Sequence, residues 1–223
     1  MLKGLGFCCF QKPLVLSGVL AMSMLADAQP LTFASDRNGG RFQIWTADAT
    51  DLRNSLQQVT NLGGASQQSR SPSWSNVAGQ IVFQFGASGV RGIHSIKPIG
   101  GPNTRLTPLA SGSYPCVDKS DPNWSPDGKF IAYTCLYSGI SEIWIHDVNA
   151  NAEKPLAVAS GSHYLRPAWS PDGTQVAFVS TGPGSVADIY TINISSKIAL
   201  LSRICGLILV PGVVPSCDKG QFP

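Results

Sequence analysis

Apolar and polar residues alternate along this chain in short runs rich in Ile, Val, Phe, Tyr, Trp and Thr, the residues that favour strands. In EIWIHDV (142–148), Ile143 and Ile145 alternate with Trp144 and His146, as side chains on opposite faces of a strand do. Paired runs lie at 30–35 and 42–48, at 80–85 and 92–99, at 130–135 and 142–148, and at 175–180 and 188–194. Weaker runs follow at 56–60, 104–108 and 154–158. The pattern predicts many short strands and tight turns rather than long helices.

The runs belong to a repeat. Trp74, Trp124 and Trp169 stand before three of the paired runs, in SPSWS, DPNWS and RPAWS, 50 and 45 residues apart. Pro-Asp-Gly at 126–128 and 171–173 is typical of a tight turn between two strands. Each unit is therefore predicted to be a four-stranded antiparallel meander with two apolar faces, which units bury by stacking around an axis.

We predict an all-β fold, a β-propeller of about four four-stranded blades, in which the tryptophans pack between blades. Four blades are at the low end of the number that closes a ring, so the sequence is compatible with a closed and with an incomplete propeller. An incomplete array would expose strand edges and an apolar blade face, which favours self-association. The unit at 30–60 lacks the tryptophan segment that would form its first strand.

The sequence Trp-Ser-Pro-Asp-Gly followed by an apolar strand, together with SDRNGGRFQIW (35–45), resembles the WD40-like PD40 repeat of TolB-like β-propellers. The resemblance covers residues 30–195. It implies a non-enzymatic protein-binding or scaffold module like the TolB propeller of the Tol–Pal cell-envelope system, with envelope partners such as a peptidoglycan-associated lipoprotein. PD40 units also occur in serine oligopeptidases and polysaccharide-degrading enzymes, so an accessory propeller fragment of such an enzyme is an alternative. A truncated remnant without function is another.

Three regions are expected along the chain: a signal peptide at 1–28, the propeller repeats at 29–196 and an atypical tail at 197–223. Basic residues, the apolar run PLVLSGVLAMSML (13–25) and the small-residue site ADA (26–28) predict export to the periplasm or medium. The apolar run is too short for a bilayer span. The tail has two interpretations. In one, KIALLS (197–202) completes the fourth unit and ICGLILV (204–210) supplies the missing first strand of unit one. In the other, the tail is an artefact of a truncated or frame-shifted gene.

Four cysteines remain after signal cleavage: Cys116, Cys135, Cys205 and Cys217. An even number in an exported chain allows two disulfides, with three possible pairings, and unpaired buried thiols are the alternative. We favour Cys116–Cys135, because Cys116 precedes a unit whose second strand ends at Cys135. Cys205 and Cys217 would then pair in the tail.

No assembled catalytic motif is found in the sequence. G-x-S-x-G is absent, and no His-x-x-x-His or Cys-x-x-Cys pair suggests a metal site, so we expect neither an enzyme nor a cofactor. A net charge of +3 without a dense basic run argues against nucleic acid. His94 and His146 are expected to be half-exposed strand residues. The best candidates for partner binding are His163, Tyr164 and Arg166, in a link between units that would border the channel mouth.

Overall fold

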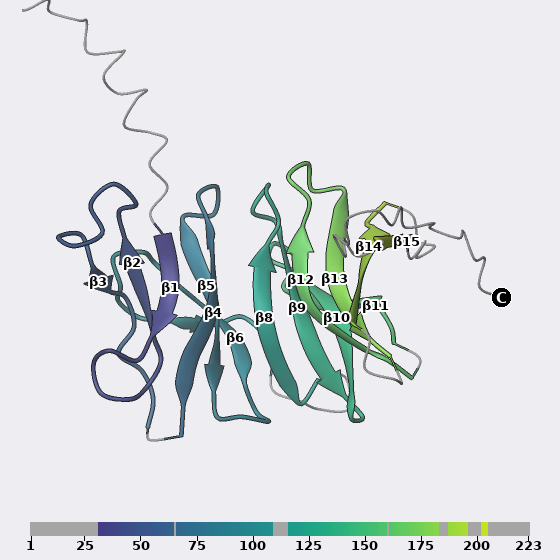
Figure 1. Ribbon diagram of the computed structural model, residues 1–223, viewed down its shortest axis with the longest axis horizontal. Helices are drawn as coiled ribbons and strands as arrows, with labels where there is room; N and C mark the ends of the chain where they lie inside the picture. The colour runs from purple at the N-terminus through teal and green to yellow at the C-terminus, as the bar shows by residue number, and fades with distance from the viewer. Residues whose placement is uncertain are drawn as a thin grey trace, which may run out of the picture.

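The computed structural model describes residues 31–64, 66–108, 116–159, 161–182, 187–195 and 202–204. In these residues the regular structure is β, arranged as four antiparallel sheets that stand side by side (Figure 1). Each sheet is one blade of a propeller. The described part of the chain contains no helix with the length and apolarity needed to cross a membrane.

The blades follow one another in chain order. Blade 1 comprises β1 (Leu31–Ser35), β2 (Gln43–Ala47) and β3 (Gln57–Gln58). Blade 2 comprises β4 (Gln68–Ser75), β5 (Gln80–Gly86), β6 (Gly92–Ile96) and β7 (Thr104–Arg105). Blade 3 comprises β8 (Asp118–Trp124), β9 (Phe130–Tyr137), β10 (Ile140–Asp147) and β11 (Ala152–Ala157). Blade 4 comprises β12 (His163–Trp169), β13 (Gln175–Thr181), β14 (Ala187–Asn193) and β15 (Ser202–Ile204).

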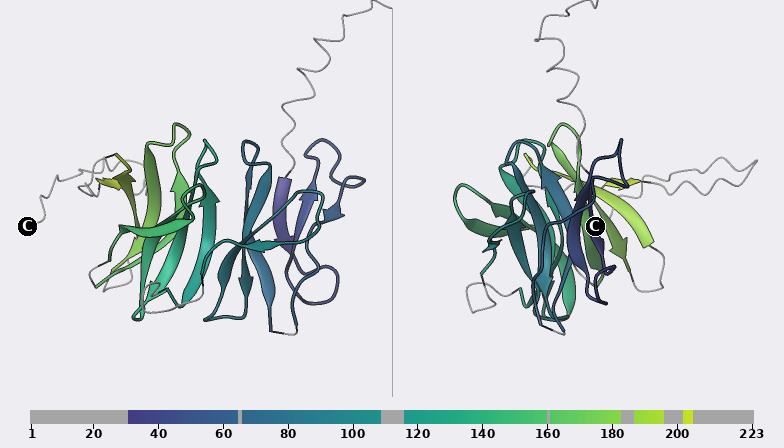
Figure 2. Two further views of the ribbon diagram at one scale, coloured as in Figure 1. Left: turned by 180° about the vertical axis from the view of Figure 1, so that it is seen from behind. Right: turned by 90° about the vertical axis from the view of Figure 1, so that its left-hand side faces the viewer.

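The predicted all-β propeller is confirmed, and it is incomplete. Blades 1 and 4 lie at opposite ends of the array, so the four blades do not close into a ring (Figures 1 and 2). Blade 1 has three described strands, because β1 occupies the place of the second strand in the other blades.

The structure corrects the expected end of the repeat. Ile204, which the sequence placed at the start of a strand for blade 1, pairs with Ile189 on the outer edge of blade 4. The outer strand of blade 4 also begins at Ser202, where the predicted outer strand ends. The proposed signal peptide and the tail beyond Ile204, with Cys205 and Cys217, lie outside the described residues.

The core lies between successive blades, as the two apolar faces of each meander predict. The core between blades 1 and 2 contains Ile44, Val59, Ile81, Phe83 and Ile96. The core between blades 2 and 3 contains Val82, Ile93, Cys116, Trp124, Ile131, Tyr133, Cys135 and Trp144. The core between blades 3 and 4 contains Ala132, Ile143, Ala157, Val176, Phe178 and Ile192. Trp74 and Trp169 pack against the first and third cores, so the predicted role of the tryptophans in interblade packing is confirmed.

The two Pro-Asp-Gly turns differ in how closely a neighbour approaches their glycines. Gly128 and Gly173 have φ of +69° and +70°, a region that side chains with a Cβ rarely adopt. A Cβ on Gly128 would lie 3.2 Å from the backbone nitrogen of Ala78 in blade 2, whereas a Cβ on Gly173 would meet nothing closer than 3.6 Å. The turn of blade 3 therefore needs glycine for its conformation and for the close approach of blade 2.

We expect Gly173→Ala to lower the free energy of unfolding by about 1–2 kcal/mol, the cost of a left-handed residue with a Cβ. Gly128→Ala should cost more, because the blade 2 turn must also shift. Urea denaturation of the two variants measures the difference. Equal losses would show that the approach of Ala78 imposes no constraint.

Candidate partner-binding surface

The inner strands β4, β8 and β12 each contain a bulge at the same place. The register of pairing with the second strand shifts between Arg70 and Ser73, between Ser120 and Asn123, and between Leu165 and Ala168. The first bulge residue is Ser71, Asp121 or Arg166, with φ of 49°, 51° and 54°. Each of them precedes a proline, which disfavours compact conformations of the residue before it.

This repeated conformation is costly. A non-glycine residue in the left-handed region costs about 1–2 kcal/mol, and it persists only where surrounding contacts hold it. Such strain gathers at functional sites. We call Ser71, Asp121 and Arg166 the inner row.

Hydrogen bonds between blades hold two of the three bulges. The backbone nitrogen of Asp121 donates to Oε1 of Gln84 at 3.0 Å. The backbone nitrogen of Arg166 donates to Oγ1 of Thr134 at 3.1 Å. Gln84 and Thr134 take equivalent places on the second strands of blades 2 and 3, and both are buried. The second strand of one blade thus fixes the bulge of the next.

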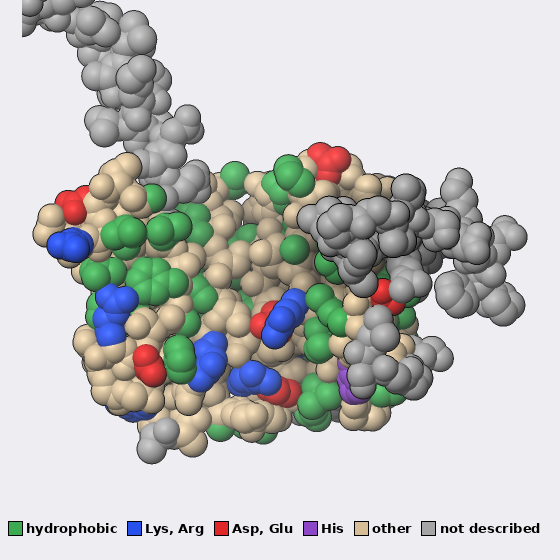
Figure 3. Space-filling view, viewed as in Figure 1, with side chains coloured by type: hydrophobic (Ala, Val, Ile, Leu, Met, Phe, Trp, Pro, Cys, Tyr) green, Lys and Arg blue, Asp and Glu red, His purple; other side chains and the backbone are tan. Residues whose placement is uncertain are grey.

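The inner row links neighbouring inner strands and presents charge. The Ser71 hydroxyl donates to Oδ1 of Asp121 at 3.0 Å, and the Ser120 hydroxyl donates to Oδ2 at 3.1 Å. Each carboxylate oxygen keeps further acceptor capacity. Arg166 is exposed and has no ion-pair partner among the described residues. Figure 3 shows acidic and basic side chains beside one another in the middle of the face that carries β8 and β12.

A polar pocket of about 310 Å³ is formed by blade 2 residues at the start of its inner strand. Its lining is Ser66, Gln68, Arg70, Gln84, Gly86, Ser88 and Arg91. The Arg70 guanidinium lies 3.7 Å from the centre of the Phe42 ring, and its Nε donates to Gln68. Gln84 joins this pocket to the inner row, because it also accepts the Asp121 amide.

Arg91 in this pocket is held by Asp118 of blade 3. Its Nε donates to Oδ1 of Asp118 at 2.9 Å, and its Nη2 forms a second contact with Oδ2. Burial raises the pKa of Asp118, but the hydrogen bonds from Arg91 outweigh burial and lower that pKa below its usual value. This bidentate pair ties the edge of the pocket to the next blade.

A second pocket, of about 400 Å³, lies at the other end of the inner strands and is lined by Trp74, Trp124, Trp169 and neighbouring turn residues. The Trp169 indole donates to the Asn123 carbonyl at 3.1 Å, and the Trp124 amide donates to the Ser73 hydroxyl at 3.1 Å. These bonds connect adjacent inner strands, so we assign this end a packing role.

The predicted candidates lie on a strand rather than in a link. His163, Tyr164 and Arg166 all belong to β12, because the inner strand begins earlier than its tryptophan segment suggests. His163 is exposed and accepts the Ser141 amide at 3.2 Å, while Tyr164 packs against Phe178 with ring centres 4.9 Å apart. Of the three, Arg166 belongs to the inner row.

Sequence reasoning missed Ser71 and Asp121 as site residues. One signal could have found them: a residue followed by proline stands three positions before each of the three tryptophans. That shared offset marks the bulge in every complete blade.

The histidines correct a second expectation. His94 and His146 are on strands, as predicted, but they are buried rather than half-exposed. Burial lowers the pKa of both, so their neutral forms are favoured. The described residues contain no group of three or more His, Cys, Asp or Glu that could hold a metal ion.

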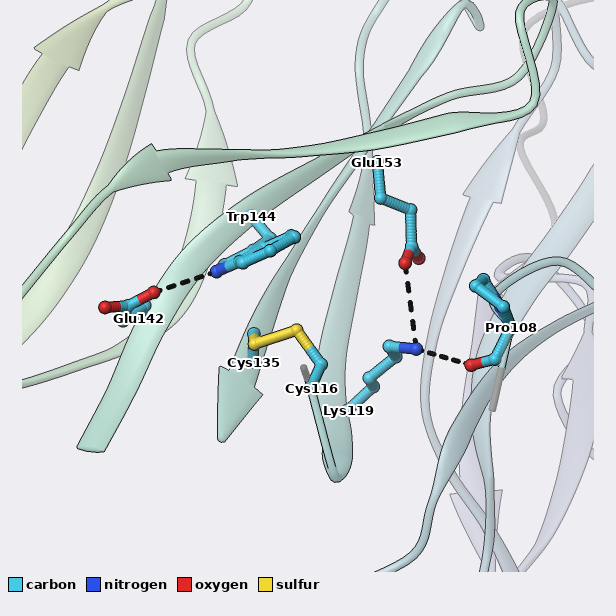
Figure 4. Close-up of a disulfide and its surroundings, with 7 residues drawn as sticks. All are labelled: Pro108, Cys116, Lys119, Cys135, Glu142, Trp144 and Glu153. Carbon is cyan, nitrogen blue, oxygen red and sulfur yellow. Dashed lines mark hydrogen bonds and ion pairs between the residues drawn. A yellow bond between two sulfur atoms is a disulfide. The ribbon is translucent and has the colours of Figure 1, made fainter. Parts of the chain in front are cut away.

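A buried charged cluster lies beside the disulfide in the core between blades 2 and 3 (Figure 4). Cys116 and Cys135 form the disulfide that the sequence analysis favours. The Lys119 amino group lies 3.7 Å from Oε2 of Glu153 and donates to the Pro108 carbonyl at 2.6 Å. Burial lowers the pKa of Lys119 and raises that of Glu153, and their mutual attraction opposes both changes. With side chains 1% and 2% exposed, this pair belongs to the core rather than to a binding surface.

Comparison with known proteins agrees with this architecture. Residues 105–205 match the family model described as PD40, the TolB beta propeller domain. Residues 105–205 therefore resemble the repeats of TolB-like β-propellers. The structure of TolB from Acinetobacter baumannii superposes on this chain with a TM-score of 0.64 and 21% identity, covering 79% of this chain and 41% of TolB.

Two curated relatives match shorter parts of the chain. The TolB homolog of Protochlamydia amoebophila is 51% identical over 39 residues, 18% of this chain and 8% of the relative. The uncharacterized peptidase YuxL of Bacillus subtilis is 31% identical over 83 residues, 34% of this chain and 12% of the relative. The matches thus span a small part of each relative's length.

Proposed function

We propose that this chain is an exported, non-enzymatic module that binds another envelope protein on its inner face. The observation that carries this proposal is the inner row, a strained bulge repeated in three consecutive blades that places Ser71, Asp121 and Arg166 on one surface. Strain held in place by interblade hydrogen bonds supplies preorganised polar groups, which reduces the ordering cost of binding. The similarity to TolB of the Tol-Pal system supports an envelope partner.

The chemistry of the row favours a polar segment of a partner. Asp121 offers carboxylate acceptors, and the exposed Arg166 offers a guanidinium fork on the neighbouring strand. A partner segment that carries a hydrogen-bond donor beside a carboxylate would bind both Asp121 and Arg166. His163 and Tyr164 flank this position on β12. By resemblance, a peptidoglycan-associated lipoprotein is the first partner to test.

The test is a binding titration of the purified chain with such a lipoprotein. Asp121→Asn removes the charge but tolerates the left-handed backbone, so the bulge should survive. We expect binding about tenfold weaker, equivalent to about 1.4 kcal/mol. Asp172→Asn, on the exposed turn of blade 4, is the matched control and should bind like the wild type.

Two results would contradict the proposal in different ways. If the wild type binds but Asp121→Asn binds equally well, the inner row is not the docking site. If the wild type does not bind, the lipoprotein is not the partner. Circular dichroism of each variant checks that the strands are retained.

The similarity to a peptidase supports a second candidate, in which the chain is an accessory propeller segment of a larger hydrolase. The supporting observation is the 83-residue match to YuxL. Sequencing the DNA beyond Pro223 in all three frames tests it. A G-x-S-x-G region there would favour the hydrolase, and further PD40 units would favour the binding module. A truncated remnant without function is expected to lack a cooperative unfolding transition.

A further inference from the structure

We call the face of a blade that packs on the following blade its front face. In every blade, the third strand has an isoleucine at the equivalent position of this face. These isoleucines are Ile44, Ile93, Ile143 and Ile189. Their positions are equivalent because each pairs with the corresponding residue of the second strand: Ala34, Gln84, Thr134 and Val179. Ile44, Ile93 and Ile143 are each 0% exposed, because the next blade covers them. Ile189 of blade 4 is 47% exposed. Blade 4 thus presents a front face of the usual composition with no blade against it among the described residues.

The back face of each blade, which packs on the preceding blade, shows the complementary pattern. Its marker is the aliphatic residue near the start of the second strand: Leu31, Ile81, Ile131 or Val176. The last three are each 0% exposed, whereas Leu31 of blade 1 is 47% exposed. A single exposed aliphatic residue is ordinary on a protein surface. Here, however, the three buried equivalents of Leu31 show that this position packs against a preceding blade.

In every interblade core, the front isoleucine and the back aliphatic residue belong to one cluster. Ile44 clusters with Ile81, Ile93 with Ile131, and Ile143 with Val176. Within the described residues, the four blades therefore present the two unused halves of an interface that they already form three times. These halves lie at opposite ends of the molecule, at β1 and at β14 (Figure 1).

We infer that a second copy of this chain occupies these faces, with blade 4 of each copy packed on blade 1 of the other. Ile189 of one copy and Leu31 of its partner would complete a fourth core of the same kind. Two such contacts related by a twofold axis close a ring. Two copies of four blades make eight, within the four to eight blades of known propellers, whereas three copies would exceed that number.

The uncovered apolar area on the back face of blade 1 is small and aliphatic. The Arg37 guanidinium lies 4.8 Å from the Trp45 ring centre and 5.4 Å from that of Phe33. It covers these aromatic rings and leaves Leu31 open. The face offered by blade 4 is correspondingly small and aliphatic, with Ala177, Val179 and Ile189 on it.

Sedimentation velocity of the purified chain tests the inference. We expect the wild type to have twice the mass of one chain at micromolar concentration. Ile189→Lys should raise the dimer dissociation constant at least tenfold, because a lysine would enter the fourth core. Ile99→Lys, the same substitution at a residue that is 79% exposed in a turn, is the control and should leave the mass unchanged.

Mixing two charge variants tests the head-to-tail arrangement. Leu31→Glu and Ile189→Lys should each be monomeric alone. In a mixed dimer, one interface is wild type and the other joins the introduced glutamate to the introduced lysine, so mixing should restore the double mass. A dimer in which like faces meet would not be restored in this way.

A monomeric wild type would overturn the inference. So would an Ile189→Lys variant that dimerises as well as Ile99→Lys, or a mass that keeps rising with concentration, which indicates an open filament. The inference does not depend on the proposed envelope partner. Loss of lipoprotein binding leaves the solution mass unaffected, so the two proposals fail separately.

Discussion

Lys119→Met is expected to lower the free energy of unfolding by about 3–5 kcal/mol, although methionine has a similar shape and is less polar. The loss arises from Glu153, a buried carboxylate that would lose its ion pair with Lys119 and keep only the smaller contributions of Tyr133 and Arg105. An unpaired buried carboxylate costs more than the pair contributes. Urea denaturation at pH 8 measures the change.

Lys129→Met is the matched control. Lys129 lies 3.5 Å from Asp127, but its side chain is 61% exposed, so the loss should be within about 0.5 kcal/mol. The double variant Lys119→Met/Glu153→Gln should recover most of the stability, because it removes the unpaired charge. A loss for Lys119→Met no larger than that for Lys129→Met would show that the buried pair contributes nothing.

The loss in Lys119→Met should also depend on pH. Burial raises the pKa of Glu153, and removing Lys119 takes away the strongest of the groups that oppose this rise, while Tyr133 and Arg105 remain. The folded variant then binds a proton more tightly than the unfolded chain, in which the glutamate pKa is about 4.3. Stability is therefore recovered as pH falls through the raised folded pKa, and the variant should lie closer to the wild type at pH 5 than at pH 8.

Charge distinguishes the interface between blades 2 and 3 from the other two. Residues 66–108 contain four basic residues and no acid, whereas residues 116–159 contain six acids and three lysines. Arg91 pairs with Asp118 across this interface, and Glu153 also attracts Arg105. Because the apolar faces of all blades are alike, we interpret these charges as a means of selecting which blades pack together.

The blades could be predicted because their signals are local. The alternation in each run and the Pro-Asp-Gly turns report on neighbouring residues, and the structure has strands and hairpins at these places. The disulfide pairing followed in the same way, because Cys116 and Cys135 flank one predicted hairpin.

The site could not be predicted because its determinants are distant in sequence. A bulge is defined by register against another strand, and the left-handed Asp121 is held by Gln84 of the preceding blade. Lys119 lies in the polar stretch CVDKSDPNW, which is typical of a solvated loop. Its burial depends on Pro108, from the segment after β7, and on Glu153 of β11. His146 was predicted as half-exposed for the same reason.

Reduction of the Cys116–Cys135 disulfide is expected to lower the free energy of unfolding by about 2–4 kcal/mol. The bond closes a separation of 19 residues and joins the segment just before β8 to β9, where the Val117 amide continues the pairing by donating to the Leu136 carbonyl. Without the link, the unfolded chain gains conformational freedom that folding must then remove. Urea denaturation with and without dithiothreitol measures the change.

Two features separate this disulfide from other effects of the reductant. Reduction should increase the dependence of the unfolding free energy on urea, because an uncrosslinked unfolded chain exposes more surface. The variant Cys116→Ala/Cys135→Ala should already have the lower stability and should not respond to dithiothreitol. If it still responds, another cysteine pair, such as the predicted Cys205–Cys217, contributes. If the wild type does not respond, the bond between blade 3's first two strands is without consequence for stability, and the core around Ile131 and Tyr133 alone holds the hairpin in place.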